Sequence, residues 1–325
     1  MTSLALRATD ELAEAIAAQA PCNPFASRAY RAAMDATGYE SWILAGDLKE
    51  QKLSDACYAF VRRGRLNTDL TIVSIPSVDP RGELWTALRA LCREQGVTRL
   101  EVESFASPAG TVVPPLADDE ARRSRQEFVL DLSSDAEEGM SRSHRRNARR
   151  AADAGTRVVR TKDAAALLAH QELMRHSLMR RRSRGEQVPD AVESRERTAL
   201  LATGSGELFQ AMKDDVVLSS VLVLRADRGG YAQSAGTSQE GMALGASHFL
   251  QREISRHLRA DGATTYGLGG AEPGSSLAEF KSLFGASTHE VPHVSCTLGT
   301  RLTRASNGIA ALWRGARTSV AARLE

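Results

Sequence analysis

Two clusters of arginine are the residues whose type and spacing most clearly suggest chemistry. The first lies within residues 140–155 and consists of Arg142, Arg145, Arg146, Arg149 and Arg150. Their spacing places the guanidinium groups along one side of a helix, and residues 140–150 contain no acid to neutralise them. A second cluster, in residues 174–185, includes Arg182 and also contains no acid. Charge runs of this kind also occur on the solvent-exposed face of a helix. Two of them in one half of the chain favour a polyanionic ligand, because each guanidinium group can bind two phosphate oxygens at once.

A second possible anion site is the segment AGTSQEGMALGASHFLQREISRHL, residues 235–258. Small residues, including Gly241 and Gly245, precede a predicted helix there. The free backbone N–H groups at the start of a helix can receive a phosphate. The pattern matches neither a P-loop nor a dinucleotide-binding fingerprint, and glycines before a helix are also common as simple turns.

Hydrolase and metal chemistry find little support in the sequence. There is no G-x-S-x-G nucleophile elbow and no H-E-x-x-H motif. The close pair His289 and His293 lies in the strand-like HEVPHV, where surface or core histidines are more common than metal ligands. We therefore predict no metal site and no tightly bound cofactor.

The elements that must position these residues form a weak internal repeat. Residues 84–104 predict a helix that ends at Gly96 and is followed by a strand, and residues 249–270 repeat this plan around Gly262. The offset of 166 residues places Leu84 on Leu250, Leu88 on Ile254, Cys92 on Leu258 and Leu100 on Tyr266. Hairpin-like strands precede both helices. The sequence therefore predicts two similar αβ subdomains around one cleft, although any αβ protein can produce such matches.

Length and composition limit the class of protein. The chain has 325 residues, 42% of them hydrophobic and 25% charged, with a formal net charge of +2. These values are typical of globular domains and exclude wholesale disorder. The four cysteines are scattered, with no paired motif, which fits a reducing compartment. The N-terminal residues predict an acidic amphipathic helix, capped near Thr9 or Asp10, and do not have the basic start and apolar run of a signal peptide. No stretch is apolar enough to span a bilayer, so we expect a cytoplasmic protein without a membrane span.

The run QEFVLDLSSDAEEGMSRSHRRNARRAADAGTRVVR (126–160) resembles the junction segment of the FemXAB-like and GNAT-like acyltransferases. The phrases GYAQSAGTS, TTYGLGG and SLAEFKSLFGAS resemble later parts of the same family, and residues 23–46 resemble its N-terminal opening. The resemblance implies a mixed α/β fold of two tandem GNAT-like subdomains around a shared cleft. We expect them at 1–135 and 136–304, with the active site in the second, and a C-terminal tail at 305–325 that docks on the first subdomain or frays.

The resemblance also implies the site residues. In the family the Lys of a Phe-Lys phrase stabilises charge in the transition state, which corresponds here to Lys281, with Phe280 beside it. Many relatives carry Asp after the strand Tyr, whereas this chain has Gly267 after Tyr266, and no base is assigned. The remaining expected residues are, for the donor, Arg142, Arg145, Arg146, Arg149, Gly241 and Gly245, and, for the acceptor, Tyr231, Ser234, Tyr266 and Arg182.

The leading hypothesis is transfer of an aminoacyl group from aminoacyl-tRNA to the amine of a small molecule or peptide, with charged tRNA as the partner. An acyl-CoA-dependent N-acyltransferase of the same fold is the alternative, because the arginines and the Gly241–Gly245 region could also hold the phosphates of coenzyme A. A non-catalytic RNA-binding protein is the third reading, which the 5% aromatic content disfavours because such proteins stack bases on aromatic rings.

Overall fold

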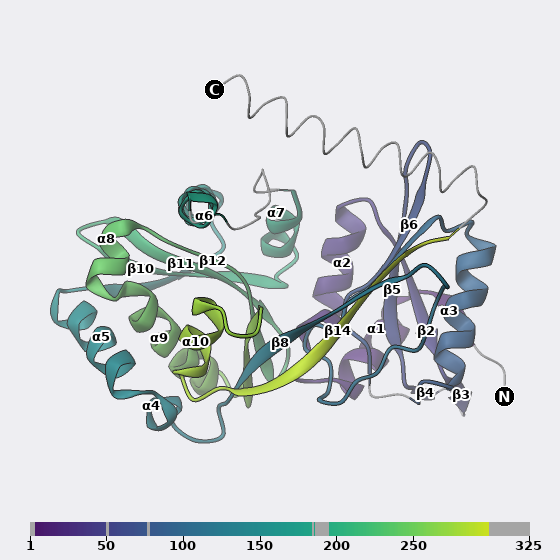
Figure 1. Ribbon diagram of the computed structural model, residues 1–325, viewed down its shortest axis with the longest axis horizontal. Helices are drawn as coiled ribbons and strands as arrows, with labels where there is room; N and C mark the ends of the chain where they lie inside the picture. The colour runs from purple at the N-terminus through teal and green to yellow at the C-terminus, as the bar shows by residue number, and fades with distance from the viewer. Residues whose placement is uncertain (1–3, 50–51, 77–78, 184, 186–194, 299–325) are drawn as a thin grey trace.

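The computed structural model describes residues 4–49, 52–76, 79–183, 185 and 195–298 (Figure 1). The strands of these residues form one continuous mixed sheet of twelve, in the order β1-β2-β5-β6-β7-β14-β8-β13-β12-β11-β10-β9, and a separate hairpin, β3-β4. Figure 1 shows two lobes joined by the long strands β8 and β14. The expected mixed α/β fold of two tandem subdomains is therefore confirmed.

The first half of the chain builds one lobe. Its elements are β1 (Leu4–Arg7), α1 (Asp10–Gln19), the 3₁₀ helix η1 (Pro24–Ala26), α2 (Arg28–Ala36), β2 (Glu40–Ala45), β3 (Asp47–Lys49), β4 (Lys52–Ser54), β5 (Cys57–Arg63), β6 (Thr68–Ile72), α3 (Glu83–Glu94) and β7 (Arg99–Val102). The predicted N-terminal helix is confirmed, since the Thr9 side chain accepts a hydrogen bond from the backbone N–H of Leu12 and caps α1.

The second half builds the other lobe. Its elements are β8 (Ala121–Asp131), α4 (Ala136–Gly139), α5 (Arg142–Asp153), β9 (Arg157–Thr161), α6 (Ala164–Ser183), α7 (Arg195–Ala202), β10 (Gly206–Lys213), β11 (Val216–Arg225), β12 (Gly229–Thr237), α8 (Gln239–Leu244), α9 (Ala246–Ala260), β13 (Thr265–Ala271), α10 (Ser276–Ser282) and β14 (Ser287–Thr297). Figure 1 shows α6 on one face of β10–β12 and α9 on the other. The expected tail at 305–325 lies outside the described residues.

The internal repeat appears in the topology as two parallel crossovers. In the first, β6 passes through α3 to β7, and in the second, β12 passes through α8 and α9 to β13. The residues that the repeat matched are buried in both halves, including Leu84 and Leu250 in the two helices and Leu100 and Tyr266 in the two strands. Gly96 and Gly262, with φ of 62° and 89°, end the two helices in the left-handed conformation that glycine adopts without strain.

Strand β14 of the second half joins the two lobes at the centre of the sheet. Strand β14, from the end of the described chain, pairs with β7 of the first half, and β8 lies between β14 and β13. The proline-containing segment 106–120 connects β7 to β8, which begins at Ala121. The two pairings of β14, with β7 and with β8, fix the relative position of the two lobes, because breaking either would expose central strands.

No helix in the described part of the chain is long and apolar enough to cross a membrane.

Candidate functional site

A cavity of about 500 Å³ lies between the two halves. The first half contributes the turn around Asn23 and parts of β5 and of the segment that follows β7, and the second half contributes β8, β12, β13 and β14. Its apolar lining includes Phe25, Ile75 and Val129, and its polar lining includes Glu127 and Tyr231. The shared cleft expected from the sequence is therefore present, and Tyr231, one of the expected acceptor residues, lines it.

Glu127 is a fully buried carboxylate in the wall of this cavity. Its Oε1 accepts a hydrogen bond of 2.7 Å from the Tyr231 hydroxyl, and its Oε2 accepts one of 3.0 Å from the backbone N–H of Ala106. The Nε2 of His289 lies 3.7 Å from Oε2. Burial raises the pKa of Glu127, and the hydrogen bonds from Tyr231 and Ala106 act in the opposite direction. A carboxylate of this kind can both bind a cation and exchange a proton.

Lys281 extends from α10 to β13, where its ammonium donates a 2.8 Å hydrogen bond to the carbonyl of Gly270. The side chain is buried, with 9% of the residue exposed, and its Nζ lies 5.9 Å from the ring centroid of Phe128. Burial lowers the pKa of the ammonium to about 8, while the charge of Glu127 raises it. Near neutral pH Lys281 is thus a poorly hydrated cation, the kind of group that stabilises a developing oxyanion.

Gly269 lies between Lys281 and Tyr231. It has a φ of 78°, and a Cβ built on it would lie 3.6 Å from Lys281 Nζ and 3.7 Å from the Tyr231 hydroxyl. Strand β13 shifts register against β8 between Gly267 and Gly269. Strands β12 and β13 pair only over Gly229–Tyr231 and Thr265–Gly267. The two strands therefore separate just where the two polar groups meet.

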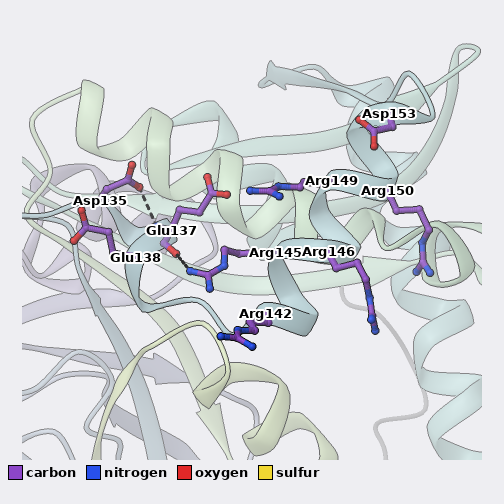
Figure 2. A pocket seen from close by; sticks show the side chains of 9 residues that line it. All are labelled: Asp135, Glu137, Glu138, Arg142, Arg145, Arg146, Arg149, Arg150 and Asp153. Carbon is purple, nitrogen blue, oxygen red and sulfur yellow. Dashed lines mark hydrogen bonds between the residues drawn. The ribbon is translucent and has the colours of Figure 1, made fainter.

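The first arginine cluster lies on α5, which Ser141 caps by accepting from the backbone N–H of His144. Its five arginines line an open groove of about 920 Å³. Figure 2 shows Arg142, Arg145 and Arg149 extending toward α4 and Arg146 and Arg150 extending away from it. Among the described residues, no carboxylate forms an ion pair with any of these five. Four acids that flank the arginines in the sequence lie at the ends of the groove: Asp135, Glu137, Glu138 and Asp153.

The start of α5 contacts the helix that carries Lys281. The backbone N–H of Ser141 donates to the carbonyl of Leu283, and His144 Nε2 lies 3.0 Å from the carbonyl of Phe280 and donates to it. The Phe280 ring packs against His144 and His248, with centroid distances of 5.3 and 5.1 Å. Phe280 therefore joins α10 to α5 and α9, and its ring is not among the groups that line the inter-half cavity.

Gly241 and Gly245, expected to bind the donor, both have a packing explanation. A Cβ at Gly241 would lie 2.3 Å from the carbonyl oxygen of Leu218, and one at Gly245 would lie 2.5 Å from that of Asn147. Gly245 also has a φ of 82° and joins α8 directly to α9. The Ser238 side chain already accepts from the Gly241 N–H at the start of α8. A role for this region in donor binding stays a prediction.

Three expected acceptor residues do not lie with Tyr231 in the cavity lining. The Ser234 hydroxyl forms a 2.9 Å hydrogen bond with Nε2 of the buried His170. Tyr266 is fully buried in the core of the second half, and its hydroxyl donates to Gln251 Oε1 at 2.7 Å. Arg182 is exposed near the end of α6. Tyr266 thus serves packing, because its inward position on β13 leaves no path to a ligand.

One group of potential metal ligands occurs in the described residues. Glu101, Glu103 and His293 lie within 4.8 Å of one another. Arg125 forms a 2.5 Å ion pair with Glu103, and its positive charge opposes a cation there. We assign no metal to this group.

Comparisons with known proteins agree with this geometry. Residues 139–282 match the family model described as an acetyltransferase (GNAT) domain. This part of the chain is therefore similar to a GNAT domain. None of the curated proteins matches the sequence.

Solved structures extend the similarity in fold to both halves of the chain. The crystal structure of FemX has a TM-score of 0.61 at 16% identity, over 89% of this chain and 96% of that chain. The C-terminal domain (DUF2156) of a putative lysylphosphatidylglycerol synthetase from Agrobacterium fabrum has a TM-score of 0.54 at 13% identity, over 93% and 96%. A tandem GNAT protein from the clavulanic acid biosynthesis pathway has 0.53 at 12% identity, over 92% and 99%. The resemblance to FemXAB-like and GNAT-like acyltransferases is confirmed.

Sequence reasoning missed Glu127. The residue lies in QEFVLDL, whose alternation places it on the same strand face as Val129, which also lines the cavity. A carboxylate on an inward strand face is a recognisable signal, but its partner Tyr231 is 104 residues away in the sequence. Only the fold brings the two together.

Proposed function

We propose that this acyltransferase moves an aminoacyl group from aminoacyl-tRNA to the amine of a small acceptor. The observation that carries the proposal is the α5 arginine groove, because the helix that forms it packs against the helix that carries Lys281 through the contacts of Ser141 and His144 with α10. A groove of about 920 Å³ lined by five arginines suits a phosphate backbone better than one compact anion. The resemblance to aminoacyl-tRNA-dependent peptidyltransferases supports the same donor.

In this proposal the donor backbone lies along α5 and its ester carbonyl reaches the point where β12 and β13 separate. The neutral amine attacks the carbonyl carbon, the C–N bond forms, and the carbonyl electron pair moves to oxygen. The Lys281 ammonium stabilises that oxyanion. When the intermediate collapses, the bond to the tRNA oxygen breaks and that oxygen takes the second proton of the amine, which leaves an amide and a free tRNA hydroxyl.

An acyl-CoA donor is the second candidate. The observation that favours it is the separation of β12 and β13 just before α8 and α9, since a helix start beside a gap between strands can receive phosphate groups. The chemistry at Lys281 is the same for both donors, because each presents an acyl carbon with a leaving group.

The test is a comparison of donor binding by charged tRNA and by acetyl-CoA at matched, moderate salt. The variant Arg142→Ala/Arg146→Ala/Arg149→Ala removes three groove arginines and leaves Arg145, which donates to the Glu137 carbonyl and holds α4. The matched control is Arg65→Ala/Arg81→Ala/Arg93→Ala, which removes three exposed arginines of the first half. Tenfold or greater loss of tRNA affinity in the groove variant alone supports the proposal.

Other outcomes separate the alternatives. Micromolar binding of acetyl-CoA with no tRNA binding would overturn the tRNA donor and favour the second candidate. Equal loss in both triple variants would show that the net charge, and not the groove, governs tRNA binding. Binding of tRNA that is never discharged, with any amine tested, would point to a non-catalytic RNA-binding protein.

A charged-tRNA donor implies that the proposed reaction takes place in the cytoplasm.

A further inference from the structure

We propose that Glu127 receives the ammonium group of the acceptor in the cavity between the halves and takes its proton before transfer, and that the acceptor is a primary amine with a compact, uncharged body. This inference rests on the proposed function and deepens it, because it assigns the base and the acceptor class that the function leaves open.

The first observation is the position of the carboxylate. Glu127 is fully buried and lines the cavity, and its two partners, the Tyr231 hydroxyl and the Ala106 N–H, are neutral. Each carboxylate oxygen can accept more than one hydrogen bond, so both still have capacity for an ammonium donor. The Nε2 of His289 lies 3.7 Å from Oε2 and has no hydrogen-bond partner among the described residues. An ammonium ligand would therefore supply a charge-assisted hydrogen bond that the buried carboxylate lacks.

The second observation is what surrounds that carboxylate. Apart from Glu127, the charged or titratable groups in the cavity lining are His289, Tyr231, Tyr58 and two cysteines. The rest is apolar or neutral, and includes Phe25, Ile75 and Val129. A ligand with a phosphate or a carboxylate in its body would find no arginine or lysine among these residues. A volume of about 500 Å³ admits a small molecule, the usual occupant of cavities of this size.

The third observation is the position of Glu127 relative to Lys281. The Lys281 ammonium lies beside Gly269, and so does the Tyr231 hydroxyl, which donates its hydrogen bond to Glu127. An amine held by Glu127 is therefore on the cavity side of the point where Lys281 meets the donor carbonyl. The proton moves from the ammonium nitrogen to a Glu127 oxygen, the freed lone pair attacks the acyl carbon, and Glu127 later returns the proton to solvent.

The groups that face Glu127 set the pH at which it can act. They are Tyr231 from β12, His289 from β14, Arg125 on its own strand β8 and Lys281 from α10, with Glu103 nearby through Tyr231 and Arg125. Burial raises the Glu127 pKa, and the Tyr231 hydroxyl lowers it. Turnover with an alkylamine should therefore fall as the pH falls through this raised pKa, and Tyr231→Phe should move that fall to higher pH.

The first experiment measures binding alone, with no donor present. The probes are 2-phenylethylamine and its neutral analogue 2-phenylethanol, titrated by calorimetry into the wild-type protein, Glu127→Gln and Glu290→Gln. The Glu127→Gln substitution keeps the shape of the side chain, because the amide oxygen can accept from Ala106 and the amide NH₂ can donate to Tyr231. Glu290 is the matched control, since it is the exposed neighbour of His289 on β14 and pairs with Ser124.

We expect the wild type and Glu290→Gln to bind the amine at least tenfold more tightly than the alcohol, and Glu127→Gln to lose that preference. The inference is overturned if the wild type binds neither probe, if it binds them equally, or if the preference survives in Glu127→Gln.

The second experiment measures transfer from whichever donor the wild type uses. The nucleophiles are 2-phenylethylamine, which is an ammonium at neutral pH, and hydroxylamine, which is largely neutral and needs no base. Glu127→Gln should lose about 100-fold with the amine and less than threefold with hydroxylamine. Equal losses with both nucleophiles would contradict the base role. If the wild type transfers to neither, the proposed function has failed, while the binding preference still decides whether Glu127 recognises an ammonium.

Discussion

The two parallel crossovers of this protein have the same connectivity but differ at their open ends. In the first half, β6 and β7 pair from Asp69–Arg99 to Ile72–Val102, and the pairing continues where Glu103 and Phe105 donate to Ile72 and Val73. In the second half, β12 and β13 stop pairing at Tyr231 and Gly267. One crossover is closed along its length, whereas the other opens after three residue pairs.

The two crossovers also differ in what they position. The closed crossover leads into the segment that supplies Ala106, whose N–H orients Glu127. The open crossover leads into α10, which places Lys281 against Gly270. Buried backbone groups are normally paired, so a parallel pair that opens beside two titratable side chains is a place where a ligand can complete the hydrogen bonding. One crossover thus forms a wall of the cavity, and the other borders the proposed site.

The largest expected effect comes from Lys281, which has no counterpart after β7. Lys281→Met keeps the length of the side chain and removes the ammonium, so turnover should fall at least 100-fold. The midpoint of thermal unfolding should not fall, because the ammonium is already disfavoured by burial. Lys213→Met, which removes a lysine paired with Asp214 at the surface, is the control. Turnover within threefold of the wild type would remove Lys281 from the mechanism.

The pH profile sharpens the same point. The ammonium form of Lys281 is the one that donates, and burial lowers its pKa from 10.5 to about 8. The protonated fraction therefore falls as the pH rises through about 8, and turnover should fall with it, about tenfold for each pH unit beyond. A rate that stays constant to pH 9.5 at saturating substrates would contradict this assignment.

An intermediate effect is expected from filling the opening between β12 and β13. In Gly269→Ala the new methyl would lie 3.2 Å from the Ala232 carbonyl oxygen, between Lys281 and Tyr231. Turnover should fall at least tenfold, because displacing either group by a fraction of an ångström misplaces the reacting atoms.

Gly262→Ala is the matched control for this variant. Gly262 has a φ of 89°, close to the 78° of Gly269, so both substitutions carry a similar backbone strain. A Cβ at Gly262 has nothing within 4 Å. The two variants should lose similar stability, and only Gly269→Ala should lose turnover. Equal turnover in both would show that the opening is not used.

How much of this was predictable follows from the range of the contacts. Short-range signals, such as the helix ends at Gly96 and Gly262 and the cap near Thr9, predicted the elements and the repeat. Lys281 came from the resemblance, since one lysine in an apolar phrase carries no chemistry of its own. The pairing of β8 with β14 and the Glu127–Tyr231 hydrogen bond join partners more than a hundred residues apart, for which one sequence gives no signal.

The smallest expected effect concerns Tyr266, which the repeat aligned with Leu100. Both side chains are buried on the second strand of their crossovers, but the tyrosine also donates to Gln251. Tyr266→Phe makes this position resemble the first half, so it should lower the free energy of unfolding by about 1 kcal/mol and change turnover less than twofold. Denaturant unfolding measures the first and a transfer assay the second. Tyr58→Phe is the control for stability, because the Tyr58 hydroxyl has no hydrogen-bond partner among the described residues and its removal should cost nothing. A large loss of turnover in Tyr266→Phe would instead support the original assignment of this residue to the acceptor site. It would also show that the core of the second crossover, unlike that of the first, affects ligand binding or transfer.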